Sequence, residues 1–251
     1  MRVFLTLTRR ELAAFFVTWT GYVIIALAAL LMGLSFVVLL IKLHLQATAV
    51  PLTQLFFGTQ YFWLIMLLVP PLITMRLFAQ ERASGTFETL LTSPVRDAQV
   101  VLAKFAAAVV FYLLLWLPLV GCIALAWRFS GAAGSPDPGT LAGAALGVLL
   151  LGSLYLAMGC LGSALARSQS VAAMLGFAGC GGLFLLGFLA DRFNSGRNLW
   201  TQLLYCASLK DHLEDFVRGV VDTRPVVFCL TFTAFFLFLT LRVLESRRWK
   251  R

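Results

Sequence analysis

Charged residues are scarce in this sequence. Only 12% of its 251 residues are Asp, Glu, Lys or Arg, whereas 61% are hydrophobic. Soluble globular domains have a charged fraction near a quarter and an apolar fraction near a half. The composition therefore excludes a soluble globular protein and indicates a membrane protein.

Signatures of catalysis and of nucleotide binding are also missing. No G-x-x-x-x-G-K-[ST] phosphate loop occurs, so we do not expect the chain to hydrolyse ATP itself. The five cysteines have no C-x-x-C or Cys/His ligand spacing. Ionisable residues are absent from the middle of the apolar runs, since Arg76, Lys104 and Arg128 lie toward their ends; this disfavours ion-coupled transporters and intramembrane enzymes. We expect no catalytic residue, no metal site and no cofactor in this chain.

Six apolar runs are long enough, at about 20 residues each, to cross a bilayer as helices. Pro70 and Pro71 interrupt the second run and Pro118 interrupts the third, which membrane helices tolerate as kinks. The predicted fold is all-α: one polytopic membrane domain over residues 1–251 with six transmembrane helices. The runs are Trp19 to Ile41, Leu55 to Phe78, Phe105 to Trp127, Leu141 to Ala166, Val171 to Ala190 and Val226 to Leu244.

The basic residues are distributed unevenly between the two sides that these runs define. With the N-terminus inside, 13 of the 20 Lys and Arg residues lie on the inner side. Because basic loops stay in the cytoplasm, both termini are predicted to be cytoplasmic. The net charge of +9 then matches anionic lipid of the bilayer, and no nucleic acid partner is expected. The outer residues are Lys42, Arg128, Arg192, Arg197, Lys210, Arg218 and Arg224.

Residues 1–18 precede the first run and combine basic with apolar positions. At helical spacing, one side holds Arg2, Thr6, Arg9, Arg10 and Ala13, and the remainder holds Phe4, Leu7, Leu12, Phe15 and Phe16. The pattern predicts an amphipathic interfacial helix with its basic side toward lipid head groups. A frayed N-terminus that only carries topogenic charge is the alternative.

The most charged interruption of the apolar sequence is AQERASGTFETLLTSPVRDAQVVLAK, from Ala79 to Lys104. Within Arg82 to Thr92, the apolar positions Ala83, Phe87, Leu90 and Leu91 follow the spacing of one helix face. Ser84 or Gly85 can cap this short helix, Pro94 ends it, and Asp97 can cap the third span. The apolar face either lies in the membrane surface or fills a groove on a cytoplasmic partner.

The same segment resembles the cytoplasmic segment between spans two and three of ABC-2-type transporter permeases, where E-R-x-x-G-T-x-E-x-L-L-x-x-P-V recurs. This chain matches the pattern at every defined position. The resemblance implies a coupling helix against an ATPase subunit within residues 80–98. The coupling residues would be Glu81, Arg82, Gly85, Thr86, Phe87, Glu88, Leu90, Leu91 and Pro94.

The C-terminal stretch from Asp211 to Lys250 resembles a subgroup that includes permeases of gliding motility and of nitrous-oxide-reductase maturation. The resemblance implies a permease of the bacterial inner (plasma) membrane, expected to be an exporter. ATP and Mg²⁺ would be bound by a separate ABC ATPase subunit. A second permease copy or paralogue would be a further partner, with an auxiliary extracytoplasmic subunit as an open option.

Two other function classes compete with this reading. A membrane scaffold that anchors an ATPase to an envelope machine would bind the ATPase without transport. An uncoupled channel would conduct without nucleotide. ATP-dependent substrate movement in vesicles separates all three.

Two features are expected on the outer side. Gly139, Gly143 and Gly147 form a G-x-x-x-G-x-x-x-G ridge that lets another helix approach, either in the same chain or in another subunit. Residues 191–224 form an extracytoplasmic loop that contains an amphipathic helix. The family resemblance implies a re-entrant helix that covers the path, and a helix resting on the bilayer is the alternative. Its apolar stripe is Leu209, Leu213, Phe216, Val217 and Val220.

Polar side chains that could line a substrate path are few. The candidates inside or near the spans are Ser35, Thr74, Ser153, Tyr155 and Thr231. A lipid-like substrate would suit such an apolar path. The sequence does not identify the substrate.

Overall fold

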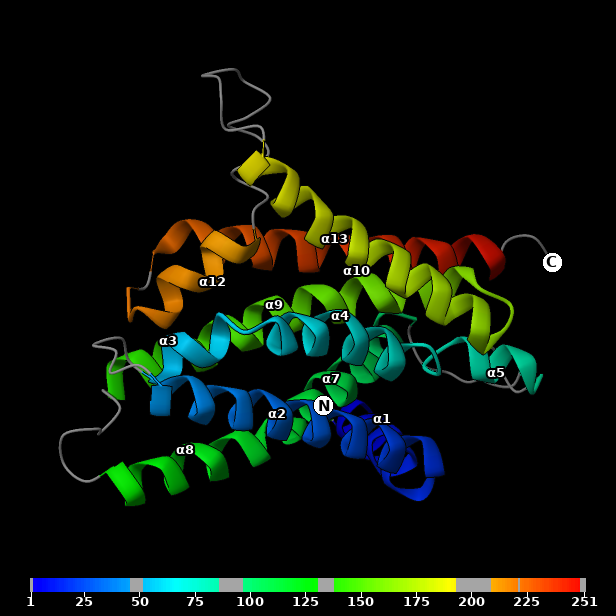
Figure 1. Cartoon of the computed structure of the whole chain (residues 1–251). Helices are drawn as coiled ribbons and strands as arrows, with labels where there is room; N and C mark the ends of the chain where they lie inside the picture. Colours follow the sequence, from blue (N-terminus) through cyan, green and yellow to red (C-terminus); the bar gives the residue numbers. More distant parts are fainter. Residues whose placement is uncertain are drawn as a thin grey trace.

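The computed structural model describes residues 2–45, 52–85, 97–130, 138–192, 209–220 and 222–248. All regular elements in these ranges are helices (Figure 1). Six of the helical segments are long and apolar enough to cross a membrane, as the sequence predicts. The all-α polytopic fold is therefore confirmed.

The first, fourth, fifth and sixth spans are single helices. They are α2 (Trp19–Leu45), α9 (Pro138–Leu165), α10 (Gln169–Arg192) and α13 (Thr223–Arg248). An even number of spans returns the chain to its starting side. We call that side the terminal end of the bundle and the other side the opposite end.

The second span begins later than the sequence predicts. The predicted start at Leu55 lies in a separate short helix, α3 (Leu52–Phe57), and the span proper is α4 (Gln60–Thr74). Thr59 causes the break because its hydroxyl caps α4 by accepting a hydrogen bond from the Phe62 N–H. The Thr59 hydroxyl also lies 2.8 Å from the Ser35 hydroxyl on α2. Pro70 and Pro71 lie inside α4, which continues past them.

The third span consists of two helices, α7 (Asp97–Leu115) and α8 (Leu117–Ser130). The break falls at Trp116, two residues before Pro118, and confirms the predicted interruption. The apolar run begins at Phe105, but α7 already begins at Asp97, close to the predicted cap. This earlier start places Lys104 inside the helix.

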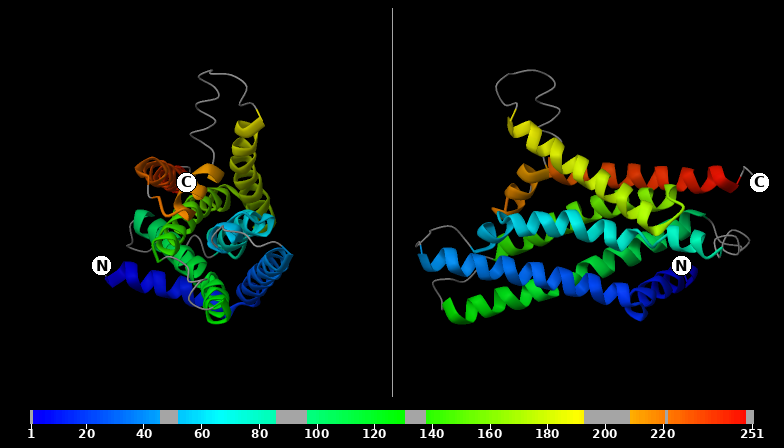
Figure 2. Two further views of the ribbon diagram at one scale, coloured as in Figure 1. Left: turned by 60° about the vertical axis from the view of Figure 1, so that its left-hand side comes forward. Right: turned by 45° about the vertical axis from the view of Figure 1, so that its right-hand side comes forward.

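Helix α9 lies at the centre and contacts α4, α7, α10, α12 (Leu209–Val217) and α13 (Figures 1 and 2). Glycines on α9 allow this close packing. A Cβ atom at Gly152 would lie 2.2 Å from the Tyr112 ring on α7, and one at Gly159 would lie 2.1 Å from the Thr74 hydroxyl on α4. Side chains at these glycines would therefore push the neighbouring spans away from α9.

The predicted N-terminal helix is α1 (Arg2–Val17). In Figure 2 (left), α1 extends sideways from the bundle, while several of the spans are foreshortened. Phe15 is buried and stacks on Phe111 of α7, with ring centroids 4.6 Å apart. The N-terminal segment is thus a docked helix and not a frayed end.

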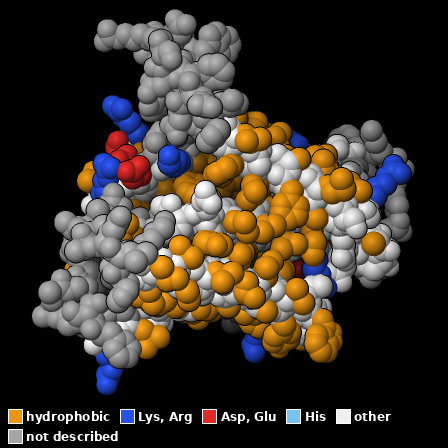
Figure 3. Space-filling view, viewed as in Figure 1, with side chains coloured by type: hydrophobic (Ala, Val, Ile, Leu, Met, Phe, Trp, Pro, Cys, Tyr) orange, Lys and Arg blue, Asp and Glu red, His pale blue; other side chains and the backbone are white. Residues whose placement is uncertain are grey.

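The outer face of the bundle is mostly hydrophobic. The face in Figure 3 shows hydrophobic side chains over most of its described surface and charged side chains near its margins. Large apolar side chains are exposed on the spans, among them Val23 and Leu30 on α2 and Phe235 and Phe238 on α13. Such a surface suits contact with lipid.

Candidate functional site

The segment that leaves the second span is fixed to the fourth. After α4, the chain makes a turn and forms α5 (Ala79–Ala83). The backbone N–H groups of Phe78 and Ala79 donate to the Ser163 hydroxyl of α9, at 3.1 and 3.2 Å. The Arg82 guanidinium donates to the Ala166 carbonyl, just after α9, at 2.7 Å. Displacement of α5 would therefore act directly on α9.

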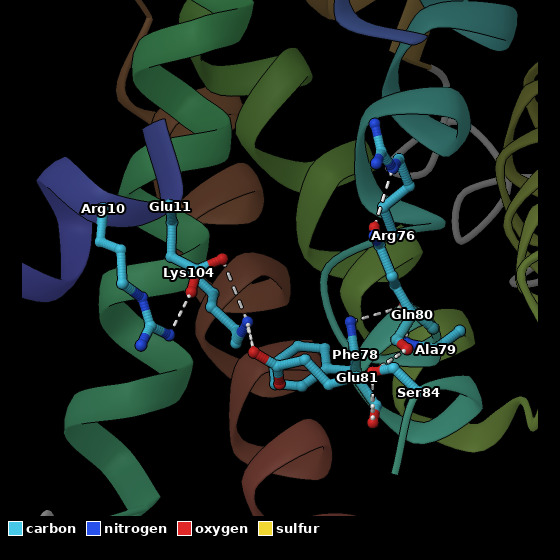
Figure 4. A network of polar contacts seen from close by, with 10 residues as sticks. Arg10, Glu11, Arg76, Phe78, Ala79, Gln80, Glu81, Ser84 and Lys104 are labelled. Atoms are coloured by element: carbon cyan, nitrogen blue, oxygen red, sulfur yellow. Dashed lines mark hydrogen bonds and ion pairs between the residues drawn. The ribbon is translucent and has the colours of Figure 1, made fainter. Parts of the chain in front are cut away.

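A buried ion-pair group ties α5 to two further helices. It consists of Glu11 on α1, Glu81 on α5 and Lys104 on α7 (Figure 4). The Lys104 ammonium lies 2.7 Å from a Glu81 oxygen and 3.1 Å from a Glu11 oxygen. Elements that are far apart in the sequence thus meet at one cation.

The ammonium of this group is almost sealed from solvent. The Lys104 side chain is 3% exposed, against 14% for Glu11 and 18% for Glu81. The Nζ atom also lies 5.6 Å from the centre of the Phe78 ring, within cation–π range. A charge buried this far is tolerated only with its counter-ions in place, so the group favours one arrangement of the three helices.

The structure describes part of the predicted coupling set. Glu81 and Arg82 lie on α5 and make the contacts above, and Gly85 follows with φ of +72°, a conformation that favours glycine. The other predicted residues lie outside the described ranges: Thr86, Phe87, Glu88, Leu90, Leu91 and Pro94.

One boundary of the predicted amphipathic helix is wrong. Arg82 and Ala83 belong to α5, which ends in a turn at Ser84 and Gly85. The positive φ of Gly85 prevents a helix from running through from Arg82. Ala83 is therefore the last residue of α5, and Phe87 lies outside the described residues.

Sequence reasoning missed the pairing of Lys104. The residue lies near a span end, as expected, but its burial between two acids was not predicted. One signal was available: Glu11 is the only acidic residue before Glu81, and it interrupts a basic and apolar helix. A lone acid in such a setting indicates a specific cationic partner.

At the opposite end, α12 packs on α9 through the predicted glycine ridge. A Cβ atom at Gly143 would lie 2.3 Å from the Phe216 carbonyl oxygen, and one at Gly147 would lie 3.1 Å from the Phe216 side chain. Gly139 lies next to Gly219, which follows α12. The helix that approaches this ridge therefore belongs to the same chain.

Four of the five predicted apolar residues of α12 are buried: Leu209, Leu213, Phe216 and Val217. Val220 is exposed, because α12 ends at Val217 and Gly219 turns the chain with φ of +79°. The inclusion of Val220 in the stripe was wrong. Since the stripe faces α9, it is not free to rest on a bilayer.

A cavity of about 290 Å³ lies beside α12 at the opposite end. Its walls come from α3, α4 and α12, and they are mainly apolar, with Lys210 and Glu214 as the charged members. Its other lining residues are Leu55, Phe57, Gly58, Trp63, Leu213 and Val217. The cavity has room for a small apolar group.

Most of the polar path candidates are internal to the chain. Ser35, Thr74, Ser153 and Tyr155 are buried, and the first three hydroxyls form hydrogen bonds within the bundle. Thr231 on α13 is exposed. Four of the five candidates therefore stabilise the bundle and do not face an open path.

Comparison with known families gives a match over most of the chain. Residues 42–242 match the model of the ABC-2 family transporter protein. The matched range includes Glu81 and Lys104, and it leaves out α1 with Glu11. A search among curated proteins finds no match. The family match covers about four fifths of the sequence, and the chain therefore belongs to the ABC-2 transporter family, as a multi-pass membrane component of transport.

Proposed function

We propose that this chain is the permease subunit of an ABC exporter, and that it works as a pair with a second copy or a paralogue. Separate ATPase subunits would bind ATP and Mg²⁺. One observation carries this proposal: residues 86–96 follow α5 after the turn at Ser84 and Gly85. Within α5, Glu81 connects through Lys104 to α7 and α1, and Arg82 connects to the end of α9. The subgroup suggested by residues 211–250 belongs to the same proposal.

The contacts of α5 suggest how force would travel. Closure of the ATPase subunits would press on residues 80–98. Glu81 would pass this displacement to Lys104 on α7, and Arg82 would pass it to the Ala166 carbonyl beyond α9. Because α9 packs on most of the other spans, its tilt would alter the whole bundle.

The terminal end is cytoplasmic in this proposal. The excess of Lys and Arg on the inner side supports the orientation. Single cysteines near Thr6 and Lys250 should resist a membrane-impermeant thiol reagent in intact cells and react after permeabilisation. Efficient labelling in intact cells would reverse the orientation.

The partner contact is tested by substitutions after α5. Leu90→Ala with Leu91→Ala should remove two apolar contacts, each worth about 1.5 to 3 kcal/mol if fully buried in a partner groove. The double variant should insert normally but lose the ATPase subunit in a pull-down from mild detergent. Glu88→Gln is the matched control, because an exposed ion pair contributes about 1 kcal/mol or less.

Other results would favour other functions. Undiminished ATPase binding by the double variant, with weaker membrane embedding, would assign the apolar face to the bilayer. Retained ATPase binding without ATP-dependent substrate movement in vesicles would favour a membrane scaffold. Substrate movement without nucleotide would favour a channel.

A further inference from the structure

A second, smaller cavity lies at the terminal end, beside the buried ion-pair group, and shares Glu11 with it. It has a volume of about 80 Å³ and lies between α1, Thr18 just before α2, and the chain after α4. Arg76, Gln80, Thr18 and Glu11 supply its polar wall. Arg76 is the only Lys or Arg among the residues that line this cavity.

The contacts of Arg76 are all to neutral groups. Its Nε–H donates to the Gln80 side-chain oxygen at 3.0 Å, and one terminal nitrogen donates to the hydroxyls of Thr18 and Thr20. Figure 4 shows the contact between Arg76 and Gln80 lying apart from the Glu81–Lys104 pair. Among the described residues, no carboxylate lies within ion-pair distance of this guanidinium.

These contacts occupy the nearby acceptor groups and leave several N–H donors of Arg76 and Gln80 without an acceptor among the described residues. The Gln80 oxygen and the two threonine hydroxyls already accept from Arg76. The other terminal nitrogen of Arg76 and the Gln80 amide nitrogen each carry two N–H groups for which the described residues provide no acceptor. The cavity is therefore suited to a ligand that offers several acceptor oxygens.

The charge balance points to an anion. Glu11 also lines the cavity, but its two oxygens accept from Arg10 and from Lys104. The two positive charges of Arg10 and Lys104 balance the two carboxylates of Glu11 and Glu81. The charge of Arg76 therefore leaves this group of five residues with a net positive charge. A guanidinium with free donors in a fork matches the oxygens of a phosphate group.

The surroundings of the cavity are apolar and exposed. Val17 and Trp19, on either side of Thr18, are 82% and 87% exposed. Tryptophan at such a position is typical of the boundary between lipid head groups and acyl chains. An amphiphile could place its head group on Arg76 and its glycerol and acyl parts against these side chains.

We propose that the Arg76 cavity binds the phosphate group of an anionic phospholipid in the leaflet at the terminal end. The lipid would hold together the end of α1, the start of α2 and the chain leaving α4. This site does not depend on the transport function, because it rests on the membrane setting and on the contacts around Arg76 and Gln80.

The test measures thermal stabilisation of the purified, delipidated full chain in a neutral detergent. Dioleoylphosphatidylglycerol should raise the melting temperature of the wild type, and dioleoylglycerol, which lacks the phosphate, should not. Arg76→Gln should need about tenfold more phosphatidylglycerol for the same shift, since a charge-assisted contact is lost. Arg242→Gln, which removes an exposed arginine on α13, should respond like the wild type.

A second variant keeps the test decisive if Arg76→Gln does not fold. Gln80→Glu places a carboxylate beside the Arg76 Nε and removes the amide donors, so it should keep basal stability and lose the lipid response. An equal lipid response in the wild type and in either variant would overturn the site. An equal shift with inorganic phosphate at the same concentration would overturn the assignment to a lipid.

Discussion

The two ends of the bundle are held together by different forces. At the terminal end, α1, α5 and α7 meet at the Lys104 ammonium, which is enclosed by two carboxylates. At the opposite end, α12 is held by apolar side chains that pack on glycines of α9. The first contact depends on charge and the second on close fit.

This difference has a mechanical consequence. Because the attraction within an ion-pair group weakens as its partners separate, the group would transmit a displacement of α5 to α7 and α1 in the proposed function. A helix such as α12, which packs closely on the glycines of α9, separates from α9 as a unit once this close packing is lost. We therefore expect variants that remove a charge to weaken helix contacts at the terminal end. Variants that change side-chain volume should weaken helix contacts at the opposite end.

The largest effect is expected for Lys104→Met. The substitution leaves the Glu11 and Glu81 carboxylates side by side without their shared cation. Removal of one partner of a buried ion pair costs about 3 to 5 kcal/mol, and because both carboxylates are partly exposed we expect about 3 kcal/mol. Thermal unfolding in detergent should show a much lower melting temperature. A melting temperature equal to that of the wild type would mean that the group does not stabilise the fold.

The next effect is expected for Phe216→Asp at the opposite end. Phe216 is 1% exposed, so the variant would bury an unpaired carboxylate unless α12 leaves α9. Undocking of α12 should impair transport and leave co-purification of the ATPase intact. The control is Val220→Asp, because Val220 is exposed and should tolerate the acid. Unchanged transport in Phe216→Asp would remove α12 from the path.

A smaller effect is expected for Gly143→Val. Its Cβ would lie 2.3 Å from the Phe216 carbonyl oxygen, so α12 must shift, at a cost of about 1 to 3 kcal/mol. A cysteine introduced at Leu213 should then react faster with a thiol reagent. Gly182→Val is the matched control, because a Cβ there has nothing within 4 Å. Equal reactivity in both variants would contradict the close fit.

The smallest effect is expected for Arg218→Gln. Arg218 pairs with Glu214 four residues earlier, and both side chains are largely exposed. Such a pair contributes about 0.5 kcal/mol or less. The melting temperature and the thiol reactivity at position 213 should both match the wild type. A large change would mean that charge, and not only close fit, holds α12.

The features that depend on the local sequence pattern, such as the spans and their breaks, could be predicted from the sequence. Long apolar runs predicted the six spans, and Pro118 predicted the break in the third. The start of α4 was missed because hydropathy does not register the cap that Thr59 provides. Val220 was misplaced because helical periodicity does not show where Gly219 ends the stripe.

The contacts between distant residues could not be predicted in the same way. Glu11 and Lys104 are 93 positions apart, and Arg76 reaches Thr18 across 58 positions. Such pairs leave no periodic signal, and only the packing of the spans brings them together. For the coupling set, the sequence motif singled out Glu81 and Arg82, and the structure shows their partners.

The central claim is that ATPase action reaches the spans through the ion-pair group, and one measurement tests it most directly. ATP hydrolysis is compared for reconstituted complexes that contain the wild-type chain or Glu81→Gln, a nearly isosteric change that removes one carboxylate charge. The account predicts that Glu81→Gln still binds the ATPase subunit but no longer couples substrate movement to hydrolysis. Full coupling in a complex of unchanged composition would contradict it.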